Sequence, residues 1–348
     1  MDTAQSPPRP PKIDVGIGLV QQAWRDRCSA HASLPATPTA VTPLKSQRAG
    51  RKSGVYRLEG VGVDGSNVVA KRCLRSIAVV ERDVYERLLP HIDLPSLRYY
   101  GSLDERGEDY CCIFLEDAGD EKLVEGDEAF AARWLARLHT SAAALSDRVT
   151  LPDCGPDRYL SHLRTGRELL DDVMTRLAPR RDDWRALEGL RRTLDELESH
   201  WDSLSSACDA APRTLVHGDF ARKNLRVRAA ASGRELIALD WETAGWGPPA
   251  ADLAFSPIRN RNNRPPRPDR PRSWGGTVSL EEYAACSHGL WYGRRNELER
   301  LAKAGTLFRS AASVRWAAEQ ALAGATRGVE RLRWCATLLP RAILEFNC

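Results

Sequence analysis

The chain has 348 residues, of which 42% are hydrophobic, and a formal net charge of +4. This length and apolar content suffice for the cores of about two domains, and so small a charge excess gives no indication of a nucleic-acid partner. Nine cysteines without regular spacing, apart from one adjacent pair, indicate reduced thiols rather than a disulfide framework or a zinc site. Because the sequence has neither an apolar signal core in MDTAQSPPRPPK nor an uninterrupted apolar stretch of about 18 residues, we expect a cytoplasmic globular protein without a membrane partner.

The N-terminal region begins with a proline-rich segment, residues 1–35, which we expect to be flexible. Two strand-like runs follow, RKSGVYRLEG at 51–60 and VVAKRC at 68–73, and Asp64-Gly65 between them predicts a hairpin turn. Lys71 lies in the second run. Taken alone, a lysine at this place is typical of an exposed strand edge.

The next segment, 77–90, has apolar residues at helical spacing and predicts an amphipathic helix with Glu81 and Tyr85 on one face. The charged neighbours of Glu81 also permit a solvent-facing role for it, with Glu86 as the alternative inward-facing acid. Beyond this helix we expect a pair of strands, at 97–101 and 110–115. The run CCIFLEDAGD crosses the end of the second strand.

Most of the remaining chain is predicted to be helical. Apolar residues recur every three or four positions in four regions, 130–143, 158–177, 183–204 and 280–348. His139, on the first of these helices, is expected to be a satisfied core residue. The apolar seams are short and irregular in phase, which argues against a coiled-coil partner surface.

A polar motif interrupts the helical part of the chain. The run LVHGDFARKNLRV is followed, after a turn, by LIALDWE. Asp219 stands two residues after His217 and five before Asn224, and Asp240 ends an apolar strand. We expect His217 to shape the loop by hydrogen bonding and not to act as a base.

The chemistry that these residues suit is phosphoryl transfer from a nucleotide. One carboxylate orients the acceptor hydroxyl, while a carboxamide and a second carboxylate hold Mg²⁺ on the phosphates. The tripeptide HGD alone is compatible with an ordinary turn. However, the strands expected at 214–216, at 225–227 and before Asp240 would gather Asp219, Asn224 and Asp240 at one end of a small β-ribbon.

This motif resembles that of the aminoglycoside phosphotransferase and choline kinase-like family, small-molecule relatives of the protein kinases. Protein kinases have HRD where this chain has His217-Gly218-Asp219, and DFG where it has Asp240-Trp241-Glu242. They also have a long segment ending in APE, for which the nearby PPAADLAF leaves no room. The resemblance implies an α+β, bilobal protein kinase-like fold. Its small antiparallel-sheet N-lobe for the nucleotide would be 36–117, and its larger, mostly helical C-lobe for catalysis and the acceptor would be 118–348.

The resemblance also implies which residues bind ATP. Lys71 would hold the α- and β-phosphates while Glu81 keeps the lysine in place. Backbone N–H groups of Ser53 and Gly54 would approach the phosphates. The backbone of a hinge between the lobes would meet the adenine at Glu116, Asp117 and Ala118.

In the C-lobe the resemblance implies the roles of the polar motif. Asp219 would be the catalytic residue that orients the acceptor hydroxyl, and Asn224 and Asp240 would bind Mg²⁺. Arg222 and Lys223 are weaker candidates for neutralising phosphate. Asp252, in the AADLAF run, is expected to tie the loop from below by hydrogen bonds.

The sequence leaves the acceptor open among aminoglycoside-type antibiotics, amino-alcohols and sugars. Helical acids such as Asp171 and Asp172 would suit a polycation, but nearly as many arginines accompany them. The Arg- and Pro-rich segment 256–276 predicts a flexible insertion, with a lid or a contact for a phosphate-rich partner as alternatives. ATP against GTP and the oligomeric state stay open as well.

Three other functions compete with the small-molecule kinase. A catalytically weak, kinase-like nucleotide-binding or regulatory module would be expected to lack one of Lys71, Asp219, Asn224 or Asp240, and all four are present. A protein kinase would need a peptide platform after the last of these residues. A scaffold acting through 256–276 would bind its partner without ATP.

Overall fold

The structure is a computed structural model that describes residues 16–29, 34–45, 53–177, 181–231, 233–257, 274–325 and 327–347. The start of the N-terminal segment and most of the Arg- and Pro-rich insertion therefore lie outside the described residues. The chain divides into two compact units, Met1–Arg82 with Leu97–Asp117, and Asp83–Ser96 with Ala118–Cys348. Residues 83–96, which we assigned to the N-lobe, thus group with the second unit.

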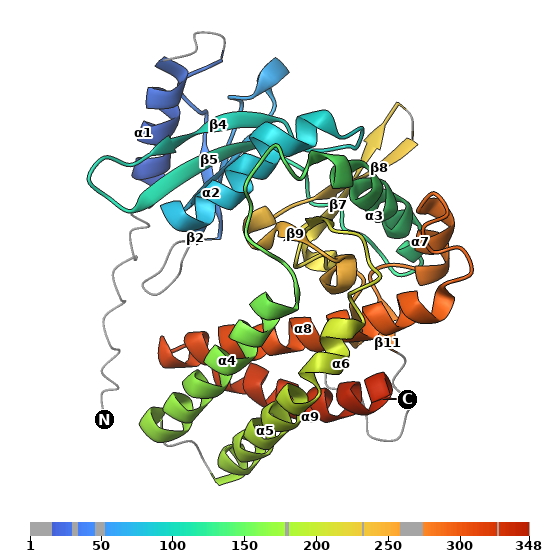
Figure 1. Cartoon of the computed structure of the whole chain (residues 1–348). Helices are drawn as coiled ribbons and strands as arrows, with labels where there is room; N and C mark the ends of the chain where they lie inside the picture. The colour runs from blue at the N-terminus through green and yellow to red at the C-terminus, as the bar shows by residue number, and fades with distance from the viewer. Residues whose placement is uncertain are drawn as a thin grey trace, which may run out of the picture. The chain divides into compact units, whose positions relative to one another are not determined.

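The first unit is built on an antiparallel five-stranded sheet with the strand order β1-β2-β3-β5-β4 (Figure 1). Its strands are β1 Val41–Lys45, β2 Ser53–Leu58, β3 Val68–Leu74, β4 Tyr99–Asp104 and β5 Tyr110–Glu116. The turn predicted between β2 and β3 is present as a 3-10 turn, Val63–Gly65. Asp64 takes a positive φ of 56° there, a conformation that Asp tolerates better than most residues.

A helix, α1, occupies Gly16–Ser29, inside the segment that the sequence predicted to be flexible. Its buried residues recur at helical spacing, and Trp24 is the largest of them. The Trp24 ring meets Phe114 of β5 edge to face, with 5.1 Å between ring centroids, and its Nε1 donates to the Pro35 carbonyl at 3.0 Å. The prediction of flexibility is therefore wrong for Gly16–Ser29, because the apolar face of this helix has a sheet to pack against.

Opposite faces of the sheet serve different purposes. Ala70 and Lys71 are neighbours on β3, so their side chains point to opposite faces. Ala70 packs in the apolar cluster built on Trp24, whereas Lys71 meets Glu81 of α2, Arg75–Asp83. One face therefore forms the core with α1, and the other carries an ion pair.

The helix predicted at 77–90 is interrupted. After α2 the chain forms a π-helical turn, Val84–Leu88, and then a 3-10 turn, Leu89–His91. Pro90 has no N–H to donate to the carbonyl four residues before it, so the α-helix ends ahead of this residue.

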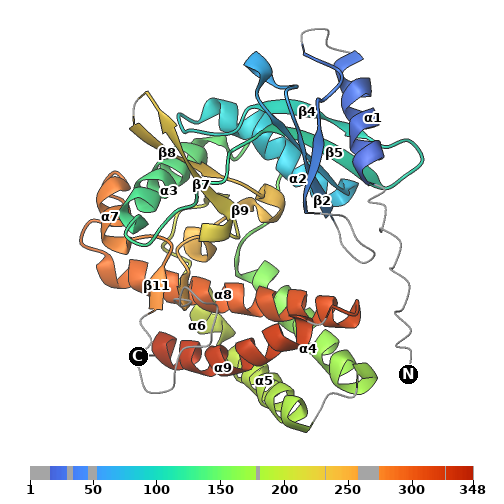
Figure 2. The same ribbon diagram turned by 180° about the vertical axis from the view of Figure 1, so that it is seen from behind.

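The second unit is mostly helical (Figure 2). Its α-helices are α3 Glu128–Ala142, α4 Pro156–Leu177, α5 Arg181–Ser199, α6 Trp201–Ser206, α7 Leu280–Cys286, α8 Arg295–Leu322 and α9 Arg327–Asn347. The helix predicted at 183–204 is divided at His200 into α5 and α6. Helix α8 packs against both α4 and α9, and its backbone also comes close to the segment that contains Ala250. At Gly305 an added Cβ would lie 1.8 Å from the Ala250 carbonyl oxygen.

Three two-stranded ribbons accompany these helices. They pair β6 Thr214–Val216 with β9 Gly245–Gly247, β7 Leu225–Ala230 with β8 Gly233–Ala238, and β10 Phe255–Pro257 with β11 Trp274–Gly276. Strands β6, β7 and β8 lie where strands were predicted, whereas β9 and its pairing with β6 were not predicted. The third ribbon joins the two ends of the Arg- and Pro-rich insertion. The predicted α+β class is confirmed.

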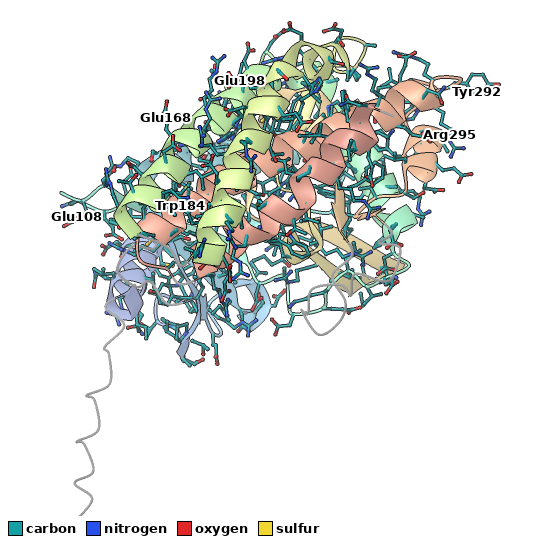
Figure 3. All side chains as sticks on the ribbon, turned by 90° about the horizontal axis from the view of Figure 1, so that it is seen from below. Glu108, Glu168, Trp184, Glu198, Tyr292 and Arg295 are labelled. Atoms are coloured by element: carbon teal, nitrogen blue, oxygen red, sulfur yellow. The ribbon has the colours of Figure 1, made fainter. Side chains whose placement is uncertain are left out.

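The outer faces of the helices carry charged side chains, among them Glu168, Glu198 and Arg295 (Figure 3). The inner face of α5 is apolar at every third or fourth position, from Leu187 to Leu197. Within the described ranges, no helix combines the length and the low polarity that a membrane crossing requires.

Candidate active site

In the first unit the structure brings Lys71 and Glu81 together. Lys71 Nζ lies 2.6 Å from Glu81 Oε2, and the two side chains are only 9% and 1% exposed. The alternative acid, Glu86, is exposed. Strand β3 positions the lysine, because it is hydrogen-bonded on both sides and places Lys71 opposite Val55 and Ile113. The ammonium group is thus held by a buried carboxylate on a helix.

Ser53 and Gly54 are the first two residues of β2 and lie opposite Cys73 and Arg72 of β3. The Ser53 hydroxyl accepts a hydrogen bond from Lys45 Nζ at 3.1 Å. Both residues are therefore part of the sheet, and the loop that precedes them lies outside the described residues. Their approach to phosphates stays a prediction.

The predicted hinge begins at the end of β5. The N–H groups of Glu116 and Asp117 donate to backbone carbonyls at 2.9 and 3.2 Å. The Asp117 carboxylate accepts from Arg57 Nε at 2.5 Å. These bonds fix the strand end within the first unit, whose boundary falls between Asp117 and Ala118. Adenine binding by this segment stays a prediction.

In the second unit, His217 shapes the loop between β6 and β7 through both ring nitrogens. Its Nε2 donates to the Leu239 carbonyl at 2.9 Å, and its Nδ1 accepts the backbone N–H of Asp219 at 3.3 Å. This pattern assigns a neutral ring with the proton on Nε2. The prediction that His217 is a structural group is confirmed.

Asp252 holds the same loop from the protein interior. Its Oδ2 accepts the backbone N–H of His217 at 2.7 Å, and its Oδ1 accepts that of Gly218 at 2.8 Å. His139 Nε2 donates to Oδ2 at 3.3 Å, and its Nδ1 accepts from the Tyr283 hydroxyl at 2.9 Å. Burial raises the pKa of Asp252, but the hydrogen bonds donated by the His139 ring and the His217 backbone oppose burial, and the pKa lies below its usual value. The predicted tie by Asp252 and the buried position of His139 are confirmed.

Gly218 allows the loop to turn. It has a φ of +79°, in the left-handed region, and a Cβ at this place would lie 2.6 Å from the Thr243 carbonyl oxygen. The Thr243 hydroxyl also donates to the His217 carbonyl at 2.9 Å. Glycine is therefore required both by the conformation and by the close approach of Thr243.

Asp219 and Asn224 are brought together as predicted. Asn224 Nδ2 donates to both the carbonyl oxygen and Oδ2 of Asp219, at 3.0 Å each. Both residues are buried, at 8% and 7% exposure. Because the amide nitrogen faces Asp219, the Asn224 Oδ1 atom points away from it and is suited to accept from water or to bind a cation.

Asp240 follows β8 in a left-handed conformation, with φ 66° and ψ 61°. Such a backbone is uncommon outside glycine and concentrates at functional sites. The Leu239 N–H donates to the Asn224 carbonyl at 2.8 Å, which brings the chain before Asp240 beside Asn224. A carboxylate and an amide oxygen fit Mg²⁺, which favours oxygen ligands and takes the rest from phosphates and water.

Two cations contact Asp219. Lys223 Nζ lies 2.5 Å from Oδ2, and an Arg309 Nη atom donates to Oδ1. Arg309 belongs to α8, and the sequence analysis did not single it out. The sequence signal that could have identified Arg309 is its place on the helix beside Phe308 and Ala312, which face the interior. Arg222 is paired with Glu128 of α3, so it is not held at Asp219.

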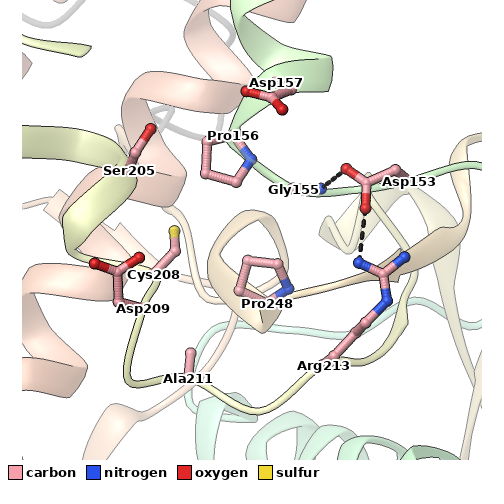
Figure 4. A pocket seen from close by; sticks show the side chains of 10 residues that line it. All are labelled: Asp153, Gly155, Pro156, Asp157, Ser205, Cys208, Asp209, Ala211, Arg213 and Pro248. Atoms are coloured by element: carbon pink, nitrogen blue, oxygen red, sulfur yellow. Dashed lines mark hydrogen bonds and ion pairs between the residues drawn. The ribbon is translucent and has the colours of Figure 1, made fainter. Parts of the chain in front are cut away.

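A separate cavity of about 390 Å³ opens at the start of α4 (Figure 4). Asp153 is one of the residues that line the cavity. Its carboxylate accepts hydrogen bonds from the Arg213 guanidinium at 2.7 Å and from the Gly155 N–H at 2.8 Å. None of the predicted site residues lines this cavity. It therefore does not bear on the assignment of the polar motif.

Comparisons with known proteins identify the family and the fold of the chain. The sequence profile described as the phosphotransferase enzyme family matches residues 63–285. A search of curated proteins found no match.

Solved structures of similar fold include three kinases with different acceptors. The GDP and kanamycin complex of APH(2")-IIia is 13% identical, with a TM-score of 0.57 over 91% of this chain and 97% of that chain. Plasmodium vivax ethanolamine kinase is 14% identical, with a TM-score of 0.55 over 86% and 82%. A microcompartment-associated aminopropanol kinase is 15% identical, with a TM-score of 0.51 over 95% and 98%.

These likenesses confirm the predicted protein kinase-like fold. The family profile covers more than half of the chain and includes Lys71, Glu81 and the whole polar motif. The chain therefore belongs to the phosphotransferase enzyme family.

Proposed function

We propose that the protein transfers the γ-phosphoryl group of ATP to a hydroxyl group of a small molecule. The observation that carries the proposal is the contact of Asn224 with Asp219 in a loop whose backbone is fixed by Asp252. A carboxylate next to a carboxamide, with Asp240 following the adjacent strand, supplies the groups that this reaction needs. The matching family profile supports the same chemistry.

In the proposed reaction the acceptor oxygen attacks the γ-phosphorus while the bond to the β,γ-bridging oxygen breaks. The bonding electrons leave with ADP, and the hydroxyl proton passes to Asp219. A loose transition state asks little of the nucleophile, so the main task of Asp219 is to orient the hydroxyl. Lys71, held by Glu81, would neutralise phosphate charge.

Asn224 Oδ1 and the Asp240 carboxylate would hold Mg²⁺, which would screen the phosphate charges when bound. The left-handed backbone of Asp240 sets where its side chain starts, and the hydrogen bonds donated by Asn224 Nδ2 orient the Asn224 side chain before any ligand arrives. Such preorganisation avoids reorganisation at the moment of reaction.

The test is Mg²⁺-dependent ADP release from ATP across aminoglycosides, amino-alcohols, sugars and hydroxy acids. Asp219→Asn is expected to reduce turnover by about 10²–10⁴-fold, the contribution of a positioned acid–base group, while nucleotide binding persists. Asp240→Asn is expected to weaken binding of the Mg²⁺-nucleotide itself. Asp202→Asn, at an exposed position of α6, is the matched control and should behave as wild type.

Full activity of Asp219→Asn would remove this residue from the reaction. Nucleotide binding without turnover by any acceptor would favour the regulatory-module alternative instead. If ATP neither binds nor turns over, the proposed function is wrong.

A further inference from the structure

The carboxylate proposed to receive the acceptor hydroxyl is already occupied. Arg309 donates to Asp219 Oδ1, and Lys223 lies at Oδ2. Asn224 Nδ2 also donates to Oδ2. A carboxylate offers about four lone pairs, so an incoming hydroxyl competes with these donors, and a cation that yields its place loses its contact. What replaces that contact determines which acceptors the site favours.

The two cations differ in their freedom to move. The Lys223 side chain is 63% exposed and can turn into water at little cost. The Arg309 side chain is 21% exposed, and it leaves from α8, whose neighbouring residues are buried. Within the described residues, Asp219 is the carboxylate found within ion-pair distance of Arg309. If Arg309 loses this partner, its guanidinium stays largely buried without a counter-charge, which is unfavourable.

A second arginine extends the positive charge. Arg158, on α4, donates to Cys154 Sγ at 2.7 Å, and no carboxylate in the described part of the chain pairs with it. Burial raises the pKa of the Cys154 thiol to about 12, so this partner is neutral and does not pair the charge of Arg158.

Arg158 of α4 and Arg309 of α8 occupy neighbouring positions where the two helices pack together. Their chain neighbours, Tyr159 of α4 and Phe308 of α8, are stacked with 4.9 Å between ring centroids and 5° between ring planes. Burial raises the pKa of Tyr159, and both arginines act in the opposite direction on it, as charges close to the same hydroxyl do.

A third arginine lies at the contact between α4 and α8. Arg315 of α8 donates to His162 Nδ1 of α4 at 3.2 Å and is paired with Glu319. Burial and the charges of Arg315 and Arg158 lower the pKa of His162 to about 4, so the histidine is neutral at physiological pH. Because Glu319 offsets Arg315, repulsion of a cationic acceptor would come mainly from Arg158 and from Arg309 once it has lost Asp219.

We propose that the acceptor is a small hydroxy acid whose carboxylate binds Arg309, with Arg158 nearby, while its hydroxyl takes an oxygen of Asp219. A guanidinium presents paired N–H donors that match a carboxylate, and the acceptor would thus return to Arg309 the counter-charge that Asp219 gives up. The inference rests on the proposed function, because it takes Asp219 as the group that receives the hydroxyl.

The test uses glycerate, glycerol and serinol, small polyols that carry a carboxylate, no charge and an ammonium group. Their binding to the full chain is measured by titration calorimetry with Mg²⁺ and a non-hydrolysable ATP analogue present. We expect glycerate to bind at least tenfold more tightly than the other two. Arg309→Gln should remove this preference, and Arg309→Lys should restore part of it.

Two further variants separate recognition from folding. Arg158→Gln leaves the Asp219 contact in place and should still reduce glycerate affinity several-fold. Arg295→Gln, on the same helix but 82% exposed and paired with Glu299, should leave it unchanged (Figure 3). Glycerol has no carboxylate for the arginines, so its affinity should not fall in any folded variant. A general disturbance of the site would be recognised by a loss of glycerol binding.

The proposal is overturned if serinol binds more tightly than glycerate, if Arg309→Gln binds glycerate like wild type, or if glycerate does not bind. Binding of the Mg²⁺-nucleotide is recorded separately in the same titrations. If the nucleotide binds and glycerate does not, the proposed kinase stands and only the acceptor class is wrong.

Discussion

The replacement Asp252→Asn tests whether the buried acid holds the catalytic loop. The wild-type carboxylate uses one oxygen for His217 and His139 and the other for the N–H of Gly218. Asparagine has nearly the same shape but offers one acceptor and one donor group. Whichever way the amide is turned, at least one buried N–H of the loop faces a donor.

The structure allows the size of the effect to be estimated. Asp252 is 1% exposed, so water does not replace a lost partner. Leaving a buried N–H without its acceptor typically costs about 1–3 kcal/mol. We expect a loss of that order in the free energy of unfolding, whereas the exposed change Asp202→Asn should stay within about 0.5 kcal/mol.

Urea denaturation measures the total loss, and hydrogen exchange locates it. Faster exchange is expected for the backbone N–H groups of His217 and Gly218, the two that Asp252 accepts. Turnover should fall as well, because Asp219 follows these residues directly. Stability equal to that of Asp202→Asn, with unchanged exchange in the loop, would refute the role assigned to Asp252.

The pH dependence has a defined sign. The pKa of Asp252 is lower in the folded protein than its usual value, so the ionised form stabilises the fold. This contribution is fully present above the unfolded pKa of about 3.9 and is lost as the pH falls through the folded value. The stability difference between wild type and Asp252→Asn should therefore be constant from neutral to mildly acidic pH and shrink only below about pH 4.

Two further predictions concern stability in urea denaturation. Gly218→Ala should destabilise the protein by more than about 1 kcal/mol, because the left-handed backbone is disfavoured for alanine and its Cβ would meet Thr243. Gly189→Ala, in open space on α5, should instead stabilise it by about 0.5–1 kcal/mol, and equal effects would contradict the reasoning. Trp24→Ala should cost about 3–5 kcal/mol because its ring is fully buried. Trp184→Ala, at a residue that is 44% exposed, should cost about 1 kcal/mol, and an equally small loss for Trp24→Ala would show that α1 is not docked.

Much of the second unit could be predicted because its signals are local. Strand β6 has the bounds that the apolar run predicts, and Asp219, Asn224 and Asp240 lie within one stretch of chain closed by short turns. The distances between such residues are set by a few backbone conformations. Asp252 is farther along the chain, but its apolar neighbours already indicated that it is buried.

The features that the sequence analysis missed depend on distant partners. Helix α1 is flanked by proline-rich sequence, and its apolar face stabilises the fold only when it packs against Phe114 and the sheet. Arg309 lies ninety residues from Asp219 along the chain, on a helix whose orientation is fixed by packing on α4 and α9. No periodicity in α8 shows which of its residues faces the loop.

The contacts of the loop divide into two groups with different consequences. Its backbone is fixed by Asp252, Gly218 and Thr243, none of which depends on the acceptor. The side chain of Asp219, in contrast, is contacted not only by Lys223 and Asn224 of the loop but also by Arg309 of α8. Substitutions on α4 and α8 can therefore change the acceptor while the geometry of phosphoryl transfer is kept. In the proposed site the charge of the acceptor is thus selected by the helices, whereas the reaction geometry is set in the loop.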